Sequence, residues 1–189
     1  MSSWNDRRAR KARLLLRPAM TATLGGRWAD IGCGDGVFTR LLVEWLAPGS
    51  TVVAVDRDQG ALRRLVQALP AQARTAVQPL RADFTQPLSL PDPAPLDGLL
   101  LANSLHFVRQ KEPVLTQLVG LLRPGGAVII IEYNADRGNG AVPYPLRDER
   151  CLALMRATGL HEAYIVTREP SSFLGEIYTA MAVKDTTAD

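Results

Sequence analysis

Apolar runs alternate with amphipathic segments along the first 132 residues of the chain. Residues 51–55 form an unbroken β-prone run, the pattern of a strand buried on both faces of a parallel sheet. Further strands are predicted at 27–31, 74–80, 96–102 and 127–132. Apolar residues at helical spacing predict helices at 37–47 and 59–69, and a third that begins near Pro113. This alternation indicates an α/β fold with a doubly wound, mostly parallel sheet and helices on both faces.

The pattern changes after residue 132. Residues 134–145 contain two glycines and two prolines and are predicted to form a loop, as are the proline-rich residues 85–95. A helix is predicted at 146–158, followed by strands at 163–167 and 176–183 that form an antiparallel hairpin. The expected sheet therefore has seven strands. Residues 123–126 are predicted to form the turn that precedes the fifth strand.

Composition and charge limit the domain organisation. A chain of 189 residues, 47% of them apolar, is expected to form one domain with its own core. We predict a basic N-terminal helix at 1–24 that packs on the core, a single domain at 25–184 and a disordered tail at 185–189. No apolar run approaches the ~20 residues of a membrane span. Two cysteines without metal-ligand spacing suggest no metal site and a reducing cytoplasm.

The positive charge is concentrated at the N-terminus. Residues 1–20 carry a net charge of +5, and the remaining residues sum to −2. This segment lacks the apolar core of a signal peptide. It is expected to form a helix over the mouth of a ligand site. A contact with RNA or another anionic surface and a frayed terminus are the alternatives. Because the rest of the chain is not basic, neither nucleic acid nor membrane is the expected partner.

A glycine-rich turn follows the first strand. The sequence Asp30-Ile-Gly-Cys-Gly-Asp-Gly36 reads as the end of a strand, a turn and the start of a helix. Glycine allows positive φ and close approach of a ligand to the backbone, and the helix start offers unpaired N–H groups. A dinucleotide fingerprint would need glycine where Val37 stands. Asp30 and Asp35 would repel a pyrophosphate but would suit a cation.

These residues resemble motif I of the class I, seven-stranded, Rossmann-like S-adenosylmethionine-dependent methyltransferases. The resemblance implies that the turn holds the methionine end of S-adenosylmethionine, that an acid after strand two binds the ribose and that an acid after strand three binds the adenine amine. It implies cofactor contacts at Asp30, Gly32, Cys33, Gly34, Asp35, Gly36, Asp56, Arg57, Asp83, Phe84 and Asn103. The alternatives are an ordinary glycine-rich turn, helix capping by Asp56 and core packing by Phe84.

Candidate catalytic and substrate residues follow strands four and five. His106 has a suitable pKa range for a general base, although a histidine here also packs between turn and strand. Tyr133, Arg137 and Tyr144 are candidates for binding the acceptor, because the loop after strand five lies over that side of such a pocket. Methyl transfer needs mainly alignment and desolvation, so a base is optional.

The predicted function is methyl transfer from S-adenosylmethionine to a small molecule, as the resemblance to uncharacterised bacterial small-molecule methyltransferases implies. One alternative is an RNA or protein methyltransferase that uses the basic N-terminal segment. Others are a non-catalytic cofactor-binding protein and a nicotinamide oxidoreductase, against which Val37 and the two acids count. The sequence leaves open the acceptor, the atom that is methylated and the oligomeric state.

Overall fold

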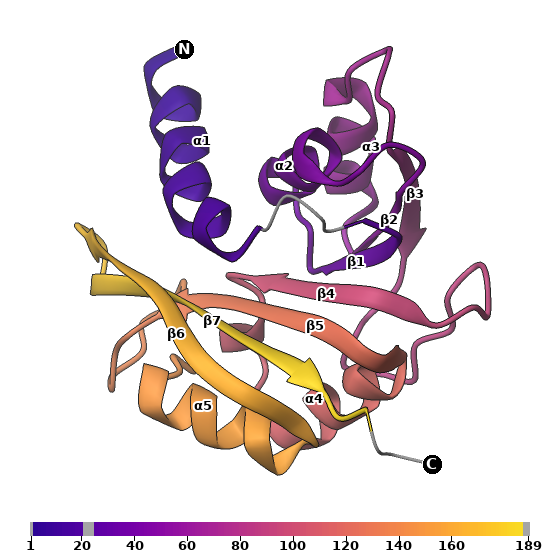
Figure 1. Cartoon of the computed structure of the whole chain (residues 1–189). Coiled ribbons are helices and arrows are strands. Elements are labelled where there is room, and N and C mark those ends of the chain that lie inside the picture. The colour runs from indigo at the N-terminus through magenta and orange to yellow at the C-terminus, as the bar shows by residue number, and fades with distance from the viewer. Residues whose placement is uncertain (1, 21–24, 187–189) are drawn as a thin grey trace.

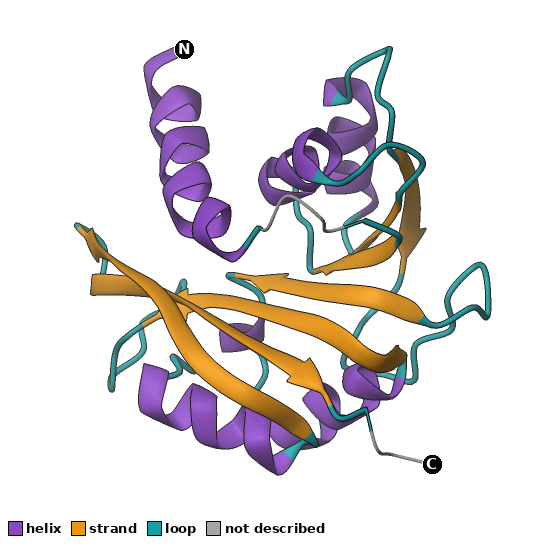
Figure 2. Ribbon diagram, in the orientation of Figure 1, coloured by secondary structure: helices purple, strands orange, loops and turns teal. Residues whose placement is uncertain are grey.

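A computed structural model describes residues 2–20 and 25–186, with side chains from residue 7 onward (Figures 1 and 2). The helices of the described residues are α1 (Ser2–Leu16), α2 (Val37–Trp45), α3 (Gln59–Ala68), α4 (Lys111–Gly120) and α5 (Asp148–Ala157), with short 3₁₀ turns η1 (Arg17–Ala19) and η2 (Leu105–Phe107). The strands are β1 (Arg27–Ile31), β2 (Thr51–Asp56), β3 (Ala76–Arg81), β4 (Leu96–Ala102), β5 (Leu122–Tyr133), β6 (Leu160–Ser171) and β7 (Gly175–Lys184).

The strands form one seven-stranded sheet in the order β3-β2-β1-β4-β5-β7-β6. The five strands from β3 to β5 run parallel, and β7 pairs antiparallel with both β5 and β6. The predicted α/β sheet with a C-terminal antiparallel hairpin is therefore confirmed. Pro79 lies in β3, where the missing N–H is tolerated because β3 is an edge strand.

Helices cover both faces of the sheet, as predicted (Figure 1). On one face, apolar residues of α1 and α2 pack with Trp28, Leu100 and Ile129 of the strands. On the other face, apolar residues of α4 and α5 pack with Ile31 and Leu99. Burying apolar surface on both faces explains why the central strands are almost continuously apolar in sequence.

Strands β5 and β6 begin several residues earlier than the sequence predicts. Leu122 already pairs with Leu96, so β5 starts before residues 123–126, which form an irregularity within the strand rather than the turn before it. Gly125 has a positive φ of 71° there, and Arg123 Nε donates to Asp97 Oδ1 at 2.7 Å. β6 extends over residues 160–171 because it pairs with β7 along nearly its whole length. Such pairing is a tertiary property that local periodicity does not report.

The N-terminal helix packs against the sheet. Leu15 and Leu16 are almost completely buried, and Thr179 Oγ1 of β7 donates to the Leu15 carbonyl at 2.8 Å. α1 ends at Leu16, and Pro18 lies in η1. The predicted domain limits stay a prediction, because residues 21–24 and 187–189 lie outside the described residues.

The remaining predictions concern membranes, metal ions and the cell compartment. In the described part of the chain, no helix combines the length and apolar character that crossing a membrane requires. Cys33 and Cys151 are buried and free. Over residues 2–20 and 25–186, no cluster of three His, Cys, Asp or Glu side chains is arranged to hold a metal ion. The cytoplasmic location stays a prediction.

Candidate active site

Two cavities meet at the carboxyl ends of β1, β2 and β4. They share Gly32, Asp56, Asn103 and Phe107 as lining residues. The first has a volume of about 410 Å³ and the second about 660 Å³. The carboxyl edge of parallel strands is where open α/β sheets bind ligands.

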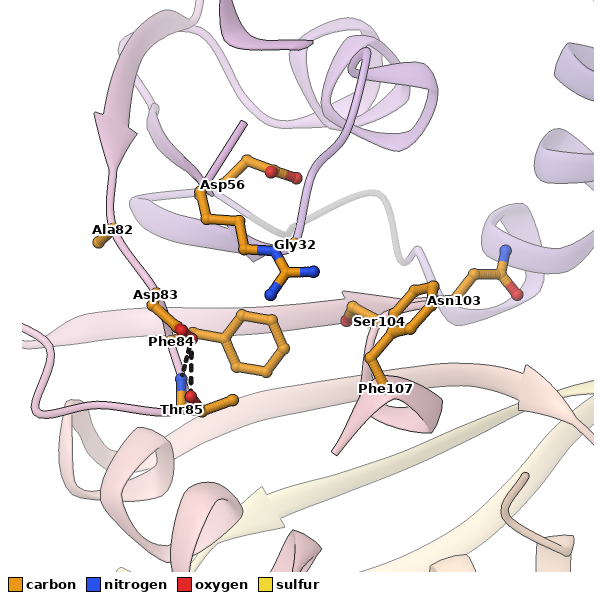
Figure 3. A pocket seen from close by; sticks show the side chains of 10 residues that line it. Gly32, Asp56, Ala82, Asp83, Phe84, Thr85, Asn103, Ser104 and Phe107 are labelled. Atoms are coloured by element: carbon orange, nitrogen blue, oxygen red, sulfur yellow. Dashed lines mark hydrogen bonds between the residues drawn. The ribbon is translucent and has the colours of Figure 1, made fainter. Parts of the chain in front are cut away.

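The first cavity is built from the ends of β2, β3 and β4 (Figure 3). Asp56, Arg57, Asp83 and Phe84 line it, as the resemblance implies, together with Thr85. The rings of Phe84 and Phe107 project toward the cavity from opposite sides (Figure 3). Thr85 donates to Asp83 Oδ1 through its hydroxyl (2.7 Å) and its backbone N–H (3.0 Å). These hydrogen bonds hold the pKa of Asp83 below its usual range, so its carboxylate is ionised at neutral pH.

The carboxylate of Asp56 ties the end of β2 to the glycine turn. Its Oδ2 accepts from the Gly34 N–H and its Oδ1 from the Asp58 N–H, both at 2.8 Å. Helix capping falls to Asp58, whose side chain accepts from the Gly60 N–H. Asp56 therefore lies at the junction of both cavities and also fixes the position of the turn.

The three glycines of the turn have different surroundings. Each has a positive φ, 75° at Gly32, 54° at Gly34 and 79° at Gly36. A Cβ at Gly34 would meet no heavy atom within 4 Å, and this residue lines the second cavity. A Cβ at Gly36 would clash with Leu65 of α3, and Gly36 lines neither cavity. Gly34 thus faces open space, whereas Gly36 allows α3 to pack closely.

The two acids that flank the turn, Asp30 and Asp35, are not lining residues of either cavity. Asp30 is 1% exposed and accepts a hydrogen bond from Thr39 Oγ1 at 2.6 Å. Burial raises the pKa of Asp30 to about 7, against the lowering effect of Thr39 and with a further raising effect from the charge of Asp56. Asp35 forms a 2.9 Å ion pair with Arg8 of α1.

The segment after β4 carries polar atoms without partners. Asn103 has a φ of 54°, which is unusual for a residue other than glycine. Its Oδ1 and the hydroxyl of Ser104 are buried and have no hydrogen-bond partner. Both residues line the first cavity, and Asn103 also lines the second. A polar ligand bound in the cavity would supply the hydrogen bonds that these atoms lack.

His106 is held in a buried contact. The residue is 3% exposed, its Nδ1 lies 2.7 Å from Glu132 Oε2, and its backbone N–H donates to Glu132 Oε1 at 3.0 Å. It lines neither cavity. His106 therefore packs between the turn after β4 and strand β5, and its position gives no support to a role as general base. Glu132, a fully buried acid in β5, was missed because an acid inside an apolar run carries no local signal of its partner.

The second cavity is enclosed by elements far apart in sequence. Its walls include Arg7, Arg8, Lys11, Ala12 and Leu15 of α1, and Ser171, Ser172 and Phe173 at the tip of the β6–β7 hairpin. Tyr133 lies in the lining, with its ring centroid 5.5 Å from that of Phe173. Arg137 and Tyr144, also predicted to bind the acceptor, line neither cavity. Sequence reasoning missed Phe107, Phe173 and the individual cations of α1.

Comparisons with known proteins agree with this geometry. A family model described as a methyltransferase domain matches residues 29–128, more than half of the chain. Among curated relatives, an uncharacterized methyltransferase of Mycobacterium tuberculosis is 34% identical over 107 residues, covering 55% of this chain and 49% of that protein. A trans-aconitate 2-methyltransferase of Azoarcus sp. is 38% identical over 130 residues, covering 66% and 46%. The chain thus spans about half the length of the curated relatives it matches.

Solved structures show the same fold. A SAM-dependent methyltransferase from Aquifex aeolicus aligns with a TM-score of 0.69 at 17% identity, covering 96% of this chain and 97% of that one. The phosphoethanolamine N-methyltransferase 2 of Haemonchus contortus, in complex with S-adenosyl-L-methionine, aligns with a TM-score of 0.72 at 14% identity, covering 93% and 52%. The chain belongs to the methyltransferase-domain family, in its class I S-adenosylmethionine-dependent form.

Proposed function

We propose that this protein transfers a methyl group from S-adenosylmethionine to a small-molecule acceptor. The observation that carries the proposal is the pair of cavities that meet at Gly32 and Asn103. One is lined by acids and an aromatic ring that suit a nucleoside, and the other is large enough for a small molecule. A cofactor at this junction would lie between the two.

The residues present fit the cofactor. Gly34 leaves open space beside the backbone, and Asn103 and Ser104 offer buried polar atoms that lack partners. Asp56 would accept hydrogen bonds from the ribose hydroxyls, and Asp83 from the exocyclic amine of adenine. Phe84 would contact the adenine ring.

Bound S-adenosylmethionine supplies an electrophilic methyl group on a sulfonium. The chain positions the acceptor and excludes water, which is the main requirement for an in-line displacement. Tyr133 and Phe173 offer aromatic surface in the second cavity. Burial, with the charges of Asp30 and Asp56, raises the pKa of the Cys33 thiol far above its usual range, so Cys33 stays protonated and is not a nucleophile.

The support for a small-molecule acceptor comes from the cavity size and from the trans-aconitate 2-methyltransferases among the relatives. Several basic residues of α1 that would serve an RNA methyltransferase are paired with other residues of the chain instead. Arg8 pairs with Asp35, and Arg13 forms two hydrogen bonds with Glu44. This arrangement favours a role for α1 in the cavity wall over one in nucleic-acid binding.

Ligand-dependent thermal unfolding tests the cofactor. S-adenosylmethionine and S-adenosylhomocysteine are expected to raise the unfolding midpoint, because selective binding to the folded state stabilises it, whereas NAD and NADP are not. A shift with NAD alone would contradict the proposal. Incubation with methyl-labelled cofactor and a fractionated cell extract then tests transfer. Label in a low-molecular-weight fraction supports a small acceptor, and binding without transfer to any fraction would favour a non-catalytic protein.

A further inference from the structure

The helix α1 brings positive charge to the glycine turn. Arg7, Arg8 and Lys11 line the second cavity together with Gly32, Cys33 and Gly34. The buried Leu15 and Leu16 anchor the carboxyl-terminal end of α1 against the sheet. The cations therefore project from a helix that the core holds in place, and not from a loose terminus.

Arg8 is the cation tied directly to the turn. Its Nη1 donates to Asp35 Oδ2 at 2.9 Å, across 27 residues of sequence. The side chains are 46% and 38% exposed, so the pair contributes little to stability. Its main consequence is geometric, because it keeps the guanidinium of Arg8 beside the residues that precede α2. Lys11 differs, because its Nζ bonds the Pro170 carbonyl and lies 3.6 Å from Glu169 Oε2 of β6.

Both acidic and basic side chains lie near the turn, and an amino-acid group likewise carries an ammonium and a carboxylate. Asp35 and Asp56, with the more deeply buried Asp30, form an acidic surround. This surround suits the ammonium and sulfonium groups of the cofactor but would repel its carboxylate. Among the described residues that line the second cavity, the cations all come from α1. Arg57 lines only the first cavity.

We propose that Arg8 binds the carboxylate of the cofactor's methionine portion, with Asp35 as the residue that orients its guanidinium. The inference rests on the proposed function, which supplies the ligand. A guanidinium is planar and always charged, and its fork of N–H donors matches a carboxylate. With five donors it can engage two carboxylates at once, that of Asp35 and that of the ligand. The basic N-terminal helix would thus complete the cofactor site.

A thermodynamic cycle tests this proposal by removing the guanidinium of Arg8 and the carboxylate of the ligand, separately and together. Isothermal titration calorimetry compares the full-length wild type with Arg8→Gln, using S-adenosylhomocysteine and its decarboxylated analogue. The wild type is expected to bind S-adenosylhomocysteine about tenfold more tightly than the analogue, as loss of one charge-assisted hydrogen bond implies. Arg8→Gln is expected to lose about tenfold in affinity for S-adenosylhomocysteine and to bind the analogue as the wild type does.

Two further variants serve as controls. Arg8→Lys keeps the charge without the planar fork and is expected to retain part of the preference for S-adenosylhomocysteine. Arg10→Gln removes an exposed cation of α1 that lines neither cavity, and it is expected to match the wild type with both ligands. Circular dichroism and the unfolding midpoint without ligand show whether each variant is folded.

Three results would overturn the inference. Arg8→Gln and Arg10→Gln could bind S-adenosylhomocysteine equally well, or Arg8→Gln could weaken both ligands by the same factor, which would indicate a structural effect. Either result leaves the proposed function standing. A wild-type chain that binds neither compound would instead remove the proposed function and this inference together. No acceptor is present in these titrations, so a carboxylate on the acceptor cannot produce the expected difference.

Discussion

Substitution of Gly34 by valine separates a ligand-binding turn from a purely structural one. Gly34 has a φ of 54°, and a Cβ built there would meet no heavy atom within 4 Å. The folded protein would therefore bear backbone strain of roughly 1–3 kcal/mol and no packing clash at the Cβ. The remaining atoms of the valine side chain would extend into the space beside the second cavity.

The strain is small against the expected stability. A domain of this size is stable by about 5–15 kcal/mol. Even at the lower limit with about 3 kcal/mol of strain, about 2 kcal/mol remains, which corresponds to roughly 30 folded molecules for each unfolded one. Circular dichroism is expected to be close to that of the wild type, while calorimetry with S-adenosylhomocysteine is expected to show no binding.

Gly36→Val is the matched comparison. Its φ is similar, 79°, but its Cβ would clash with Leu65 of α3. This variant is expected to lose stability through disrupted packing, with a lower unfolding midpoint than Gly34→Val. If Gly34→Val binds S-adenosylhomocysteine with wild-type affinity, the turn does not hold the cofactor and the assignment of the site is refuted.

Three further predictions concern the acids of the site. Asp56→Ala should weaken S-adenosylhomocysteine binding by about 10- to 100-fold, as loss of charged hydrogen bonds to the ribose implies, and unchanged affinity by calorimetry would remove Asp56 from the site. Asp35→Asn keeps the shape of the side chain and should weaken binding less than Gly34→Val; the same titration checks the order. Folding raises the pKa of Asp30 from 3.8 to about 7, so the folded protein binds this proton more tightly than the unfolded chain does. The free energy of unfolding therefore falls as pH rises from about 4 to 7, because the carboxyl group must then ionise inside the folded protein. Asp30→Asn should therefore gain unfolding free energy relative to the wild type between pH 5 and 8, and urea denaturation showing no such change would contradict the buried acid.

Local patterns were sufficient to predict the fold. The apolar run at 51–55 and its counterparts report burial on both faces, and the alternation with helices then leaves few topologies. The carboxyl ends of parallel strands lie at one edge of the sheet, so residues that follow these strands could be assigned to one site. Asp56, Asp83 and Asn103 do line connected cavities. These predictions depend only on the direction of each strand.

The rest of the site depends on contacts between distant segments. The contact of Lys11 with Pro170 joins residues 159 positions apart, and no local pattern indicates that α1 and the β6–β7 hairpin form walls of one cavity. The loop after β5 was the natural place to seek acceptor contacts, yet Arg137 and Tyr144 lie outside the lining of both cavities. The sequence places both residues in this loop, but it does not show whether the loop turns toward the cavities or away from them.

The hydrogen bond between Thr179 and Leu15 has a consequence for biosynthesis. These residues are 164 positions apart, so at 5–20 residues per second a ribosome would make Thr179 roughly 8–33 s after Leu15. The strands and turns of the nucleoside-facing cavity would leave the ribosome during this interval. α1, although translated first, would gain its hydrogen bond to β7 only after that strand has been made. The second cavity, whose walls include both α1 and the β6–β7 hairpin, would therefore be completed only late in synthesis.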